Sequence, residues 1–375
     1  MTGIEGSAMT SAAVHVSEID VYPIRIPLRR PVSHATARYV HRDYVVVRVR
    51  TREGIDGLSY ALAGPLVAAA IHAVAPLLIE RAADTIESTQ SWLYQQLRLL
   101  GRRGIAMIAL SCLDNALWDI QAKAQGVPVY QLLGGSSATL PVAVGAALYY
   151  EGQSVAEVAR QCDDLVSHGF RAVKIRVGGL PIEEDVRRVA AIREAIGPGT
   201  RLMMNANMAW ESLDAALAFL DRISEFDVAW CAEPIDPDNW SVWKQLARAS
   251  AVALASGEQE SGRWAFARLV DDHAVAAIQP DVTRAGGVTE WIRIAALANE
   301  ASMPVIPHWS PDLHVHLGSF TPTLEWLEYL PNDSMVNLDE VLVERLRPED
   351  GSISPPERPG FGLSFDWNAV DSYRV

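Results

Sequence analysis

The segment AVKIRVGG, residues 172–179, has the form of a buried strand that ends in a glycine turn. Its apolar residues alternate with Lys174 and Arg176, and alternation along a strand places both of these side chains on one side. Short apolar runs with polar residues at their ends recur about every 20 to 31 residues from Lys174 as far as Glu328. This interval is that of one β/α unit, so the sequence predicts an α/β barrel of parallel strands.

Residues of chemically active types stand at the ends of these runs. They are Lys174, Arg176, Asn205, Asn207, Glu233, Glu258, Asp281, His308 and Glu328. In a parallel barrel the carboxyl ends of the strands meet at one mouth, so side chains far apart in sequence surround one substrate. We expect the active site there. The eight strands are expected near 142–146, 172–177, 202–207, 228–233, 252–258, 276–281, 305–308 and 324–329.

The pattern of the chain changes at Pro141 and again after residue 335. Residues 14–140 combine β-branched runs with helical periods, which is typical of a separate α+β module. Residues 141–335 alternate strand and helix and are expected to form the barrel. Residues 336–375, rich in proline and glycine after Asp350, are expected to return and pack on the first module. Residues 1–13 are small and polar and are expected to be a disordered leader.

Composition excludes two classes of partner. The 375 residues carry a formal net charge of −14 with no long run of Lys or Arg, which disfavours nucleic acid and anionic membranes. No apolar stretch reaches spanning length, and no secretory pattern is evident at the start. The three cysteines lack CxxC spacing and are expected to be buried thiols of a reducing compartment. We therefore expect a cytoplasmic protein that acts on a small molecule.

Three oxygen donors come from consecutive predicted strands. Asn205, Glu233 and Glu258 could bind a hard divalent cation such as Mg²⁺, one per subunit, and leave coordination positions for a substrate. Asp281 and His308 come from two neighbouring strands, and a carboxylate behind an imidazole fixes its tautomer and raises its basicity. With Lys174 opposite, this set predicts removal of a proton next to a substrate carboxylate.

Eight motifs in this order resemble the enolase superfamily, and within it the mandelate racemase and acid-sugar dehydratase subgroup. The residues that carry the resemblance are LDNALWD at 113–119 with LLGG at 132–135, VKIR at 173–176, NAN at 205–207, AEP at 232–234, GE at 257–258, QPD at 279–281 with GG at 286–287, PH at 307–308 and WLE at 326–328. The resemblance covers nearly the whole chain. It implies an α+β capping domain, completed by the C-terminal tail, over a (β/α)7β barrel, one essential Mg²⁺, and α-hydroxy or sugar-derived carboxylates as substrates.

The resemblance also implies a role for each residue. Lys174 would neutralise a substrate carboxylate oxygen, Arg176 would orient the carboxylate or a hydroxyl, and Glu328 would hydrogen-bond the oxygen that gains charge. Asp281 would support His308 as the base. Asn207 is expected to bind substrate, and the cap loop around Pro31–Tyr39, with His34 and Arg38, to set substrate choice. Relatives form symmetric oligomers, so a homo-oligomer is expected by analogy.

Two residues depart from the subgroup pattern. Asn205 stands where an aspartate ligand is usual, so the ligand charge falls from −3 to −2 and Mg²⁺ binding should weaken. Arg176 stands where many relatives have a second lysine, and arginine does not deprotonate at working pH. This disfavours a two-base racemase and favours a dehydratase in which His308 removes the α-proton and the β-hydroxyl leaves, giving a 2-keto-3-deoxy acid from an aldonate or aldarate.

Alternatives remain open on the sequence alone. The chain could be a racemase or epimerase of an α-hydroxy acid, or a non-catalytic homologue whose metal site has decayed at Asn205. Arg176 could instead pair with Glu233 or Asn205 and hold strands together. Arg29, Arg30, His34 and Arg38 could bind a distal carboxylate or form a solvated basic turn. His314 and His316 are expected to be exposed or satisfied histidines, because i, i+2 spacing separates them on a helix.

Overall fold

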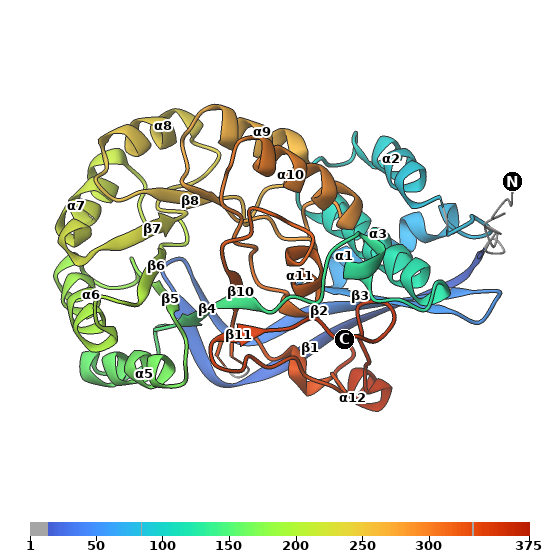
Figure 1. Cartoon of the computed structure of the whole chain (residues 1–375), viewed down its shortest axis with the longest axis horizontal. Coiled ribbons are helices and arrows are strands. Elements are labelled where there is room, and N and C mark those ends of the chain that lie inside the picture. Colours follow the sequence, from blue (N-terminus) through green and yellow to red (C-terminus); the bar gives the residue numbers. More distant parts are fainter. Residues whose placement is uncertain (1–13, 84, 332–333) are drawn as a thin grey trace, which may run out of the picture.

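The computed structural model describes residues 14–83, 85–331 and 334–375, so the leader expected over residues 1–13 lies outside the described residues. Figure 1 shows two parts, a three-stranded sheet with its helices and a barrel whose helices form an arc outside the strands. The sheet is the antiparallel meander β1 (Val16–His34), β2 (Ala37–Thr51) and β3 (Asp56–Ala61). Its helices are α1 (Pro65–Val74), α2 (Ile86–Leu97), α3 (Ile105–Ala124) and α4 (Val129–Leu132), with a 3₁₀ turn η1 (Ala75–Leu77).

Helix α3 holds the cap together because it is buried along most of its length. It packs so closely on β3 that a Cβ at Gly57 would lie 2.2 Å from the backbone oxygen of Ala116. A glycine is therefore required there for the helix to reach the sheet. Its far face contacts the barrel, where Asp114 accepts hydrogen bonds from the backbone and the hydroxyl of Thr289 at 2.9 and 2.7 Å.

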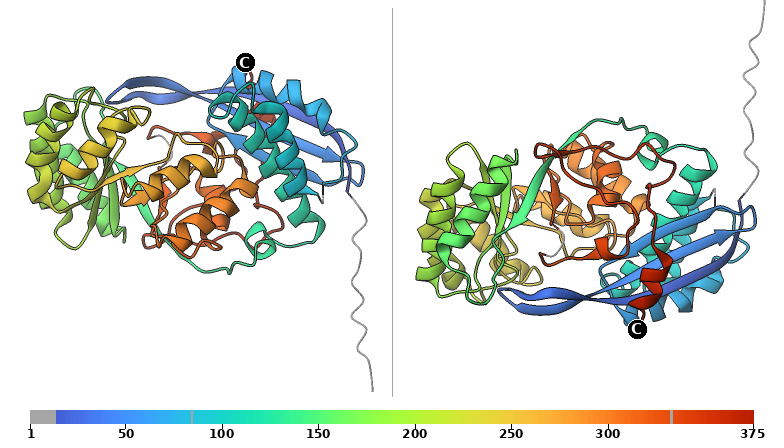
Figure 2. Two further views of the ribbon diagram at one scale, coloured as in Figure 1. Left: turned by 90° about the horizontal axis from the view of Figure 1, so that it is seen from above. Right: turned by 90° about the horizontal axis from the view of Figure 1, so that it is seen from below.

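The hairpin of β1 and β2 reaches from the cap to the barrel mouth, as both views of Figure 2 show. Its outer end pairs with the loop after the first barrel strand, through Ser33 N to Tyr149 O at 2.9 Å. Thr36 at its tip donates a hydrogen bond to the backbone oxygen of Asn207 at 2.9 Å. The hairpin tip therefore lies over the carboxyl ends of the barrel strands.

The barrel confirms the predicted (β/α)7β order. Its elements are β4 (Leu140–Ala146), α5 (Val155–Ser167), β5 (Ala172–Arg176), α6 (Ile182–Ile196), β6 (Arg201–Asn205), α7 (Leu213–Ile223), η2 (Ser224–Phe226), β7 (Val228–Ala232), α8 (Trp240–Ala249), β8 (Leu254–Ser256), α9 (Arg263–Asp271), β9 (Ala277–Ile278), α10 (Val288–Glu300), α11 (Pro311–Gly318) and β10 (Leu327–Tyr329). Strands run in parallel from β10 through β4 to β9. The expected seventh strand is reduced to bridges from Val305 to Ile278 and Leu324, which close the circle.

Side chains inside the barrel form a small core of their own. Ala143, Ala172, Met203, Trp230, Ala232, Ala255, Ala277 and Ile306 pack there, apart from the larger core between strands and helices. Most of these residues are small and fit the narrow interior. Because side chains alternate along a strand, the residue two positions further on also points inward, at the barrel mouth. Lys174 follows Ala172 and Asn205 follows Met203 in this way, so the core beneath the site sets the direction of its side chains.

The C-terminal segment returns to the cap, as the fold prediction required. It contains η3 (Leu338–Glu340), β11 (Ser352–Ile353), which pairs with β4, and α12 (Trp367–Ser372). Trp367 packs on Tyr22 of β1 with ring centroids 5.2 Å apart, and Arg25 N donates to Tyr373 O at 2.9 Å. Cys112, Cys162 and Cys231 are buried free thiols, as expected. Among the described helices, none is both long and apolar enough to cross a membrane.

Candidate active site

A cavity of about 270 Å³ lies at the barrel mouth, beneath the hairpin tip. Its walls come from three separate regions of the chain: the barrel strand ends, the cap hairpin and the segment that follows β10. The barrel contributes Arg176, Asn207, Glu258 and His308, and the cap contributes His34 and Tyr39. Five of the residues selected from sequence are thus buried or half-buried around one space that is accessible to a small molecule.

The three predicted metal donors lie together. Asn205 Nδ2 donates to Glu258 Oε2 at 2.7 Å, and Asn205 Oδ1 accepts from Asn207 N at 2.8 Å. Glu233 Oε1 accepts from Ser256 Oγ at 2.8 Å. Side-chain alternation places Asn205, but Glu233 and Glu258 depend on irregular backbone, with φ of 46° at Glu233 and 120° at Gly257. Regular alternation along β7 and β8 would point Glu233 and Glu258 away from the barrel interior. These backbone conformations turn both carboxylates inward instead.

The electrostatics of these carboxylates fit a bound cation. Burial and the negative charge of Glu258 raise the pKa of Glu233 to about 8. Burial also opposes ionisation of Glu258, but the charges of His308, Lys174 and Arg176 outweigh it and lower its pKa. A divalent cation between two buried carboxylates removes their repulsion. In the described part of the chain, no group of three His, Cys, Asp or Glu side chains is placed to hold a metal ion. The third donor here is instead the amide of Asn205. Its oxygen accepts one hydrogen bond and keeps a second lone pair for a metal. Two carboxylates and an amide suit Mg²⁺.

His308 and Asp281 form the expected pair. His308 Nδ1 lies 3.0 Å from Asp281 Oδ2, while Asp281 Oδ1 accepts from the backbone and hydroxyl of Thr283, each at 2.8 Å. Burial would raise the pKa of Asp281, but its hydrogen bond to His308 and the positive charges nearby hold it well below its usual value. The ionised carboxylate keeps the proton of His308 on Nδ1. Nε2 is then the nitrogen that can accept a proton from a substrate.

Lys174 and Glu328 form a fully buried ion pair on the barrel floor. Their atoms Nζ and Oε1 are 2.9 Å apart, and Glu328 Oε2 accepts from Trp309 N at 2.9 Å. Burial opposes ionisation of Glu328, but the charges of Lys174, His308 and Arg176 lower its pKa to about 2. Among the described residues, neither Lys174 Nζ nor Glu328 Oε1 has a partner in hydrogen-bond geometry. Beyond their mutual ion pair, both atoms therefore keep hydrogen-bonding capacity, and they lie beneath the cavity and not in its wall.

Arg176 lines the cavity and does not join the strands, so the alternative pairing with Glu233 or Asn205 is wrong. Its guanidinium is buried, and within the described chain Nε and Nη1 have no hydrogen-bond partner. Nη2 contacts Met335 Sδ at 3.7 Å. Buried donors without partners are costly unless a ligand satisfies them. Arg176 is thus oriented for an anion or hydroxyl in the cavity.

The structure divides the predicted cap residues. His34 lines the cavity, with Nε2 2.9 Å from Tyr39 Oη, and burial together with the charge of Arg176 lowers its pKa to about 4. Arg38 is exposed and does not line the cavity, so the structure gives its predicted contact with substrate no support. Alternation turns Arg38 away from the face that presents Tyr39. The basic side chain that the hairpin contributes is Arg42, which is 8% exposed.

Sequence reasoning missed Arg42 because the hairpin is irregular. The register of β1 shifts between Pro27 and Val32, opposite Val40, so the parity of side chains does not carry from Arg38 to Arg42. Arg284 was also missed, although it lies three residues after Asp281 and its Nε is 3.6 Å from that carboxylate. A search for cations one turn beyond each strand end could have found it.

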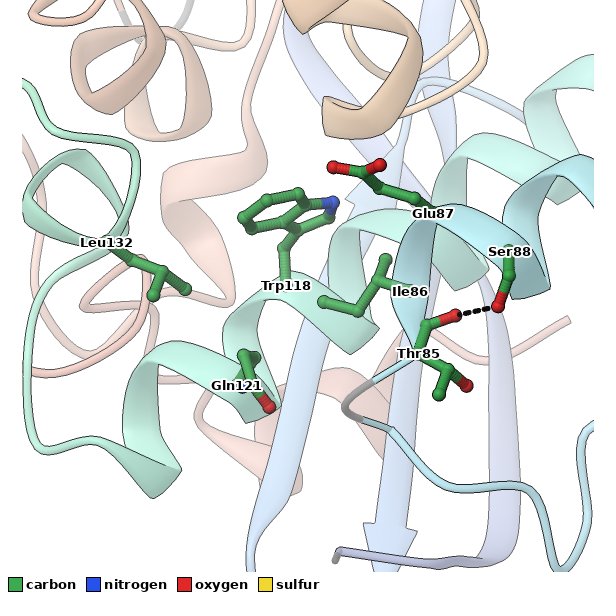
Figure 3. A pocket seen from close by; sticks show the side chains of 7 residues that line it. All are labelled: Thr85, Ile86, Glu87, Ser88, Trp118, Gln121 and Leu132. Carbon is green, nitrogen blue, oxygen red and sulfur yellow. Dashed lines mark hydrogen bonds between the residues drawn. The ribbon is translucent and has the colours of Figure 1, made fainter. Parts of the chain in front are cut away.

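Two other features are structural. His314 and His316 are buried, not exposed, and both are satisfied, the former accepting from Val282 N at 3.0 Å and the latter contacting Phe361 O at 3.2 Å. A second hollow, of about 490 Å³, lies in the cap beside α2 and α3 (Figure 3). Glu87 alone is ionisable among the described residues that line it. It therefore lacks the groups that acid–base or metal chemistry needs.

Comparisons with known proteins place the chain in a family. Residues 17–134 match the model of the mandelate racemase / muconate lactonizing enzyme N-terminal domain, and residues 157–369 match that of the enolase C-terminal domain-like family. A 3,6-anhydro-α-L-galactonate cycloisomerase of Streptomyces coelicolor is 31% identical over 361 residues, 95% of this chain and 98% of that protein.

Solved structures share the whole architecture. A racemase from Streptomyces coelicolor A3(2) with bound magnesium has a TM-score of 0.89 at 30% identity, covering 96% of this chain and 100% of that one. An L-talarate dehydratase from Polaromonas sp. JS666, complexed with Mg and L-glucarate, has a TM-score of 0.86 at 26% identity, covering 97% and 98%.

Proposed function

We propose, from the premise that this chain belongs to the mandelate racemase / muconate lactonizing enzyme family of the enolase superfamily, that it is a Mg²⁺-dependent dehydratase of an acid sugar. The observation that carries the proposal is the His308–Asp281 pair facing the same cavity as Glu258 and Arg176. His308 is the one base, Glu258 is a carboxylate that can bind a metal cation, and Arg176 is a cation that keeps its proton. These are the requirements for removing a proton next to a carboxylate.

Asn205, Glu233 and Glu258 would hold Mg²⁺. When bound, the ion lowers the free energy of negative charge that develops on the substrate carboxylate. Lys174 would neutralise one carboxylate oxygen from the barrel floor. Glu328 is ionised in the ligand-free site, so its expected hydrogen bond to the oxygen that gains charge would require it to take up a proton when substrate binds. Relatives with bound magnesium support this choice of metal.

The reaction would begin at His308. Nε2 takes the proton from the carbon next to the carboxylate, while the hydrogen bond from Nδ1 to Asp281 stabilises the imidazolium that forms. The electron pair of the broken C–H bond moves into the enediolate. The C–O bond at the neighbouring carbon then breaks, and the hydroxyl leaves as water with a proton donated by the His308 imidazolium, which returns the base to its neutral form. Tautomerisation of the resulting enol gives a 2-keto-3-deoxy acid.

A single base favours elimination over racemisation. A racemase needs proton transfer at both faces of the α-carbon, and Arg176 cannot act as a base on the face opposite His308. Lys174 could do so only by leaving Glu328, with which it forms a buried ion pair. A racemase or epimerase therefore remains the alternative. A non-catalytic binding protein becomes less favoured because the predicted base pair and metal donors lie together at one cavity.

A cycloisomerase is a second candidate, motivated by the cycloisomerase relative at 31% identity. The same proton would be removed, but the leaving oxygen would belong to a ring instead of a free hydroxyl. The cavity does not distinguish the two leaving groups, whereas the products do: the cyclic substrate yields an isomer, and the open acid loses water.

The test is a panel of open-chain aldonates and aldarates together with anhydro and lactone forms, each incubated with enzyme and Mg²⁺. A 2-keto acid from an open-chain member supports the dehydratase. In D₂O, deuterium at the α-carbon of recovered substrate without inversion supports a single base, and incorporation into both stereoisomers supports the racemase. If every member remains unchanged and no α-proton exchanges, the proposed function is refuted. The expected homo-oligomer is tested by the mass of the protein in solution.

A further inference from the structure

We propose that the substrate is a dicarboxylate, an aldarate and not an aldonate, and that Arg42 of the cap hairpin binds its distal carboxylate. This inference rests on the proposed function, because Arg42 lines the same cavity as the residues that would carry out the reaction. Arg42 lies on β2, well away in sequence from the barrel residues, yet it lines the cavity with Arg176, Glu258 and His308. The hairpin thus adds a cation to the wall of the cavity that also contains the residues that would act on the first carboxylate.

Arg42 is a buried cation without a counter-ion. Its side chain is 8% exposed, Nε has no hydrogen-bond partner, and no carboxylate of the described residues pairs with its guanidinium. Its ring contact is with Tyr39, whose centroid lies 4.1 Å from Cζ. Stacking on an aromatic ring compensates part of the desolvation of a guanidinium but leaves its N–H donors unsatisfied. A ligand carboxylate is the partner that its planar donor geometry fits best.

The neighbours of Arg42 hold it in place without neutralising it. Tyr39 is fixed by His34 through the 2.9 Å contact between Oη and Nε2. The depressed pKa of His34 keeps that imidazole uncharged at neutral pH, so it competes with Arg42 for no anion. Thr36 ties the same hairpin tip to the barrel by its hydrogen bond to Asn207 O. Arg42 is therefore preorganised, and a bound anion loses little further side-chain entropy.

The charge balance of the site also favours a dianion. Apart from His34, Tyr39 and His308, which are counted as uncharged, the ionisable side chains at the cavity or directly beneath it are Arg42, Lys174, Arg176 and Arg284 against Glu233, Glu258, Asp281 and Glu328. These charges cancel when all eight are ionised, so bound Mg²⁺ leaves an excess of two positive charges. A diacid supplies two negative charges and an aldonate supplies one. The uncharged Asn205 contributes to this excess, because a third carboxylate ligand would remove one unit of it.

The size of the cavity is consistent with a short diacid. Its volume of about 270 Å³ is at the lower limit of small-molecule sites, which are roughly 300–1,000 Å³. Arg176 Nε and Nη1 are also without partners, so hydroxyl groups between the two carboxylates have donors to meet. Leu62, Leu330 and Val336 form the apolar part of the wall and offer no partner to a terminal hydroxyl.

Equilibrium binding tests the inference apart from catalysis. Galactarate and galactonate differ only at the distal carbon, a carboxylate in one and a CH₂OH group in the other. We would titrate both by calorimetry, with saturating Mg²⁺, into protein carrying His308→Asn so that no ligand is consumed. Galactarate should bind at least 10-fold more tightly. Arg42→Met should weaken galactarate binding by about 10- to 150-fold, the range for a hydrogen-bonded charged group, and leave galactonate nearly unchanged.

Matched variants separate recognition from folding. Arg38→Met removes an exposed arginine from the same strand and should change neither affinity. Arg42→Lys keeps the charge without the fork geometry and should recover part of the galactarate affinity. The ligand-free melting temperature of Arg42→Met should be unchanged or higher, because the variant removes a buried unpaired charge. Equal affinity for the two acids, or equal weakening of both by Arg42→Met, would overturn the inference. If the wild type converts galactonate but not galactarate, the proposed reaction stands and the dicarboxylate assignment fails.

Discussion

Replacing Asn205 by aspartate should make the protein less stable without metal and bind Mg²⁺ more tightly. In the structure Asn205 Nδ2 donates to Glu258 Oε2 at 2.7 Å, so the amide holds a buried carboxylate in place. Asn205→Asp removes a hydrogen bond to a charged group worth about 1.5–3 kcal/mol. It also adds a like charge, and two unit charges 4 Å apart repel by about 4 kcal/mol at an effective dielectric constant of 20.

The new carboxylate can avoid part of this repulsion by keeping a proton, so the cost depends on pH. Its pKa in the folded state is raised above the unfolded value of about 3.9. The penalty is therefore absent below that pH and grows as pH rises through the folded pKa. We expect a loss of about 2–4 kcal/mol in the free energy of unfolding at pH 8 in EDTA, and a much smaller loss at pH 4.

Urea unfolding with EDTA and with Mg²⁺ measures both effects. The added ligand charge should lower the dissociation constant for Mg²⁺ by about tenfold or more, and saturating metal should restore the lost stability. Asn299→Asp makes the same change at an exposed position of α10 and should cost below about 1 kcal/mol. Equal stabilities of the two variants in EDTA, with unchanged Mg²⁺ affinity in Asn205→Asp, would refute the location of the metal site.

Three further perturbations test the remaining groups. Glu328→Gln leaves Lys174 buried without its counter-charge and should cost about 3–5 kcal/mol in urea unfolding, while the double variant with Lys174→Met should recover much of it. Because the pKa of Glu328 is lowered to about 2, its contribution to stability is present above about pH 4.3 and is lost as pH falls toward 2, so the acid limb of the wild-type stability profile should flatten in Glu328→Gln. Asp281→Asn should reduce kcat by about 10²–10⁴-fold with little change in KM, since it disturbs the tautomer of His308 and not substrate binding, and an equal rise in KM would contradict this role. His308→Asn should abolish exchange of the substrate α-proton in D₂O while Mg²⁺ binding, followed by calorimetry, persists.

The sequence was sufficient for the architecture because one periodic signal runs through the barrel. Side-chain alternation reaches Lys174, Asn205, Asp281 and His308 from Ala172, Met203, Ala277 and Ile306 of the barrel interior, and Glu328 from the partly buried Trp326. A two-residue period and a β/α interval therefore specify their direction without knowledge of the fold in detail. The weaker strand signals were correctly located, but the seventh strand shrank to a bridge at Val305.

The cap side of the site could not be predicted in the same way. The direction of its side chains depends on a register shift in the hairpin. The sequence around Arg38 and Arg42 gives no sign of this shift. The burial of His314 and His316 likewise depends on contacts with segments distant in sequence, at Val282 and Phe361. The residues proposed to set substrate choice thus lie where long-range packing, and not periodicity, sets the position of side chains.

The central claim is that an amide and two carboxylates hold one divalent cation beside His308. Anomalous diffraction from crystals soaked in Mn²⁺, a scatterer with the same oxygen preference as Mg²⁺, measures this directly. The account predicts one strong peak per subunit among the side-chain oxygens of Asn205, Glu233 and Glu258. No peak there at saturating Mn²⁺, or a peak on other ligands, would contradict it.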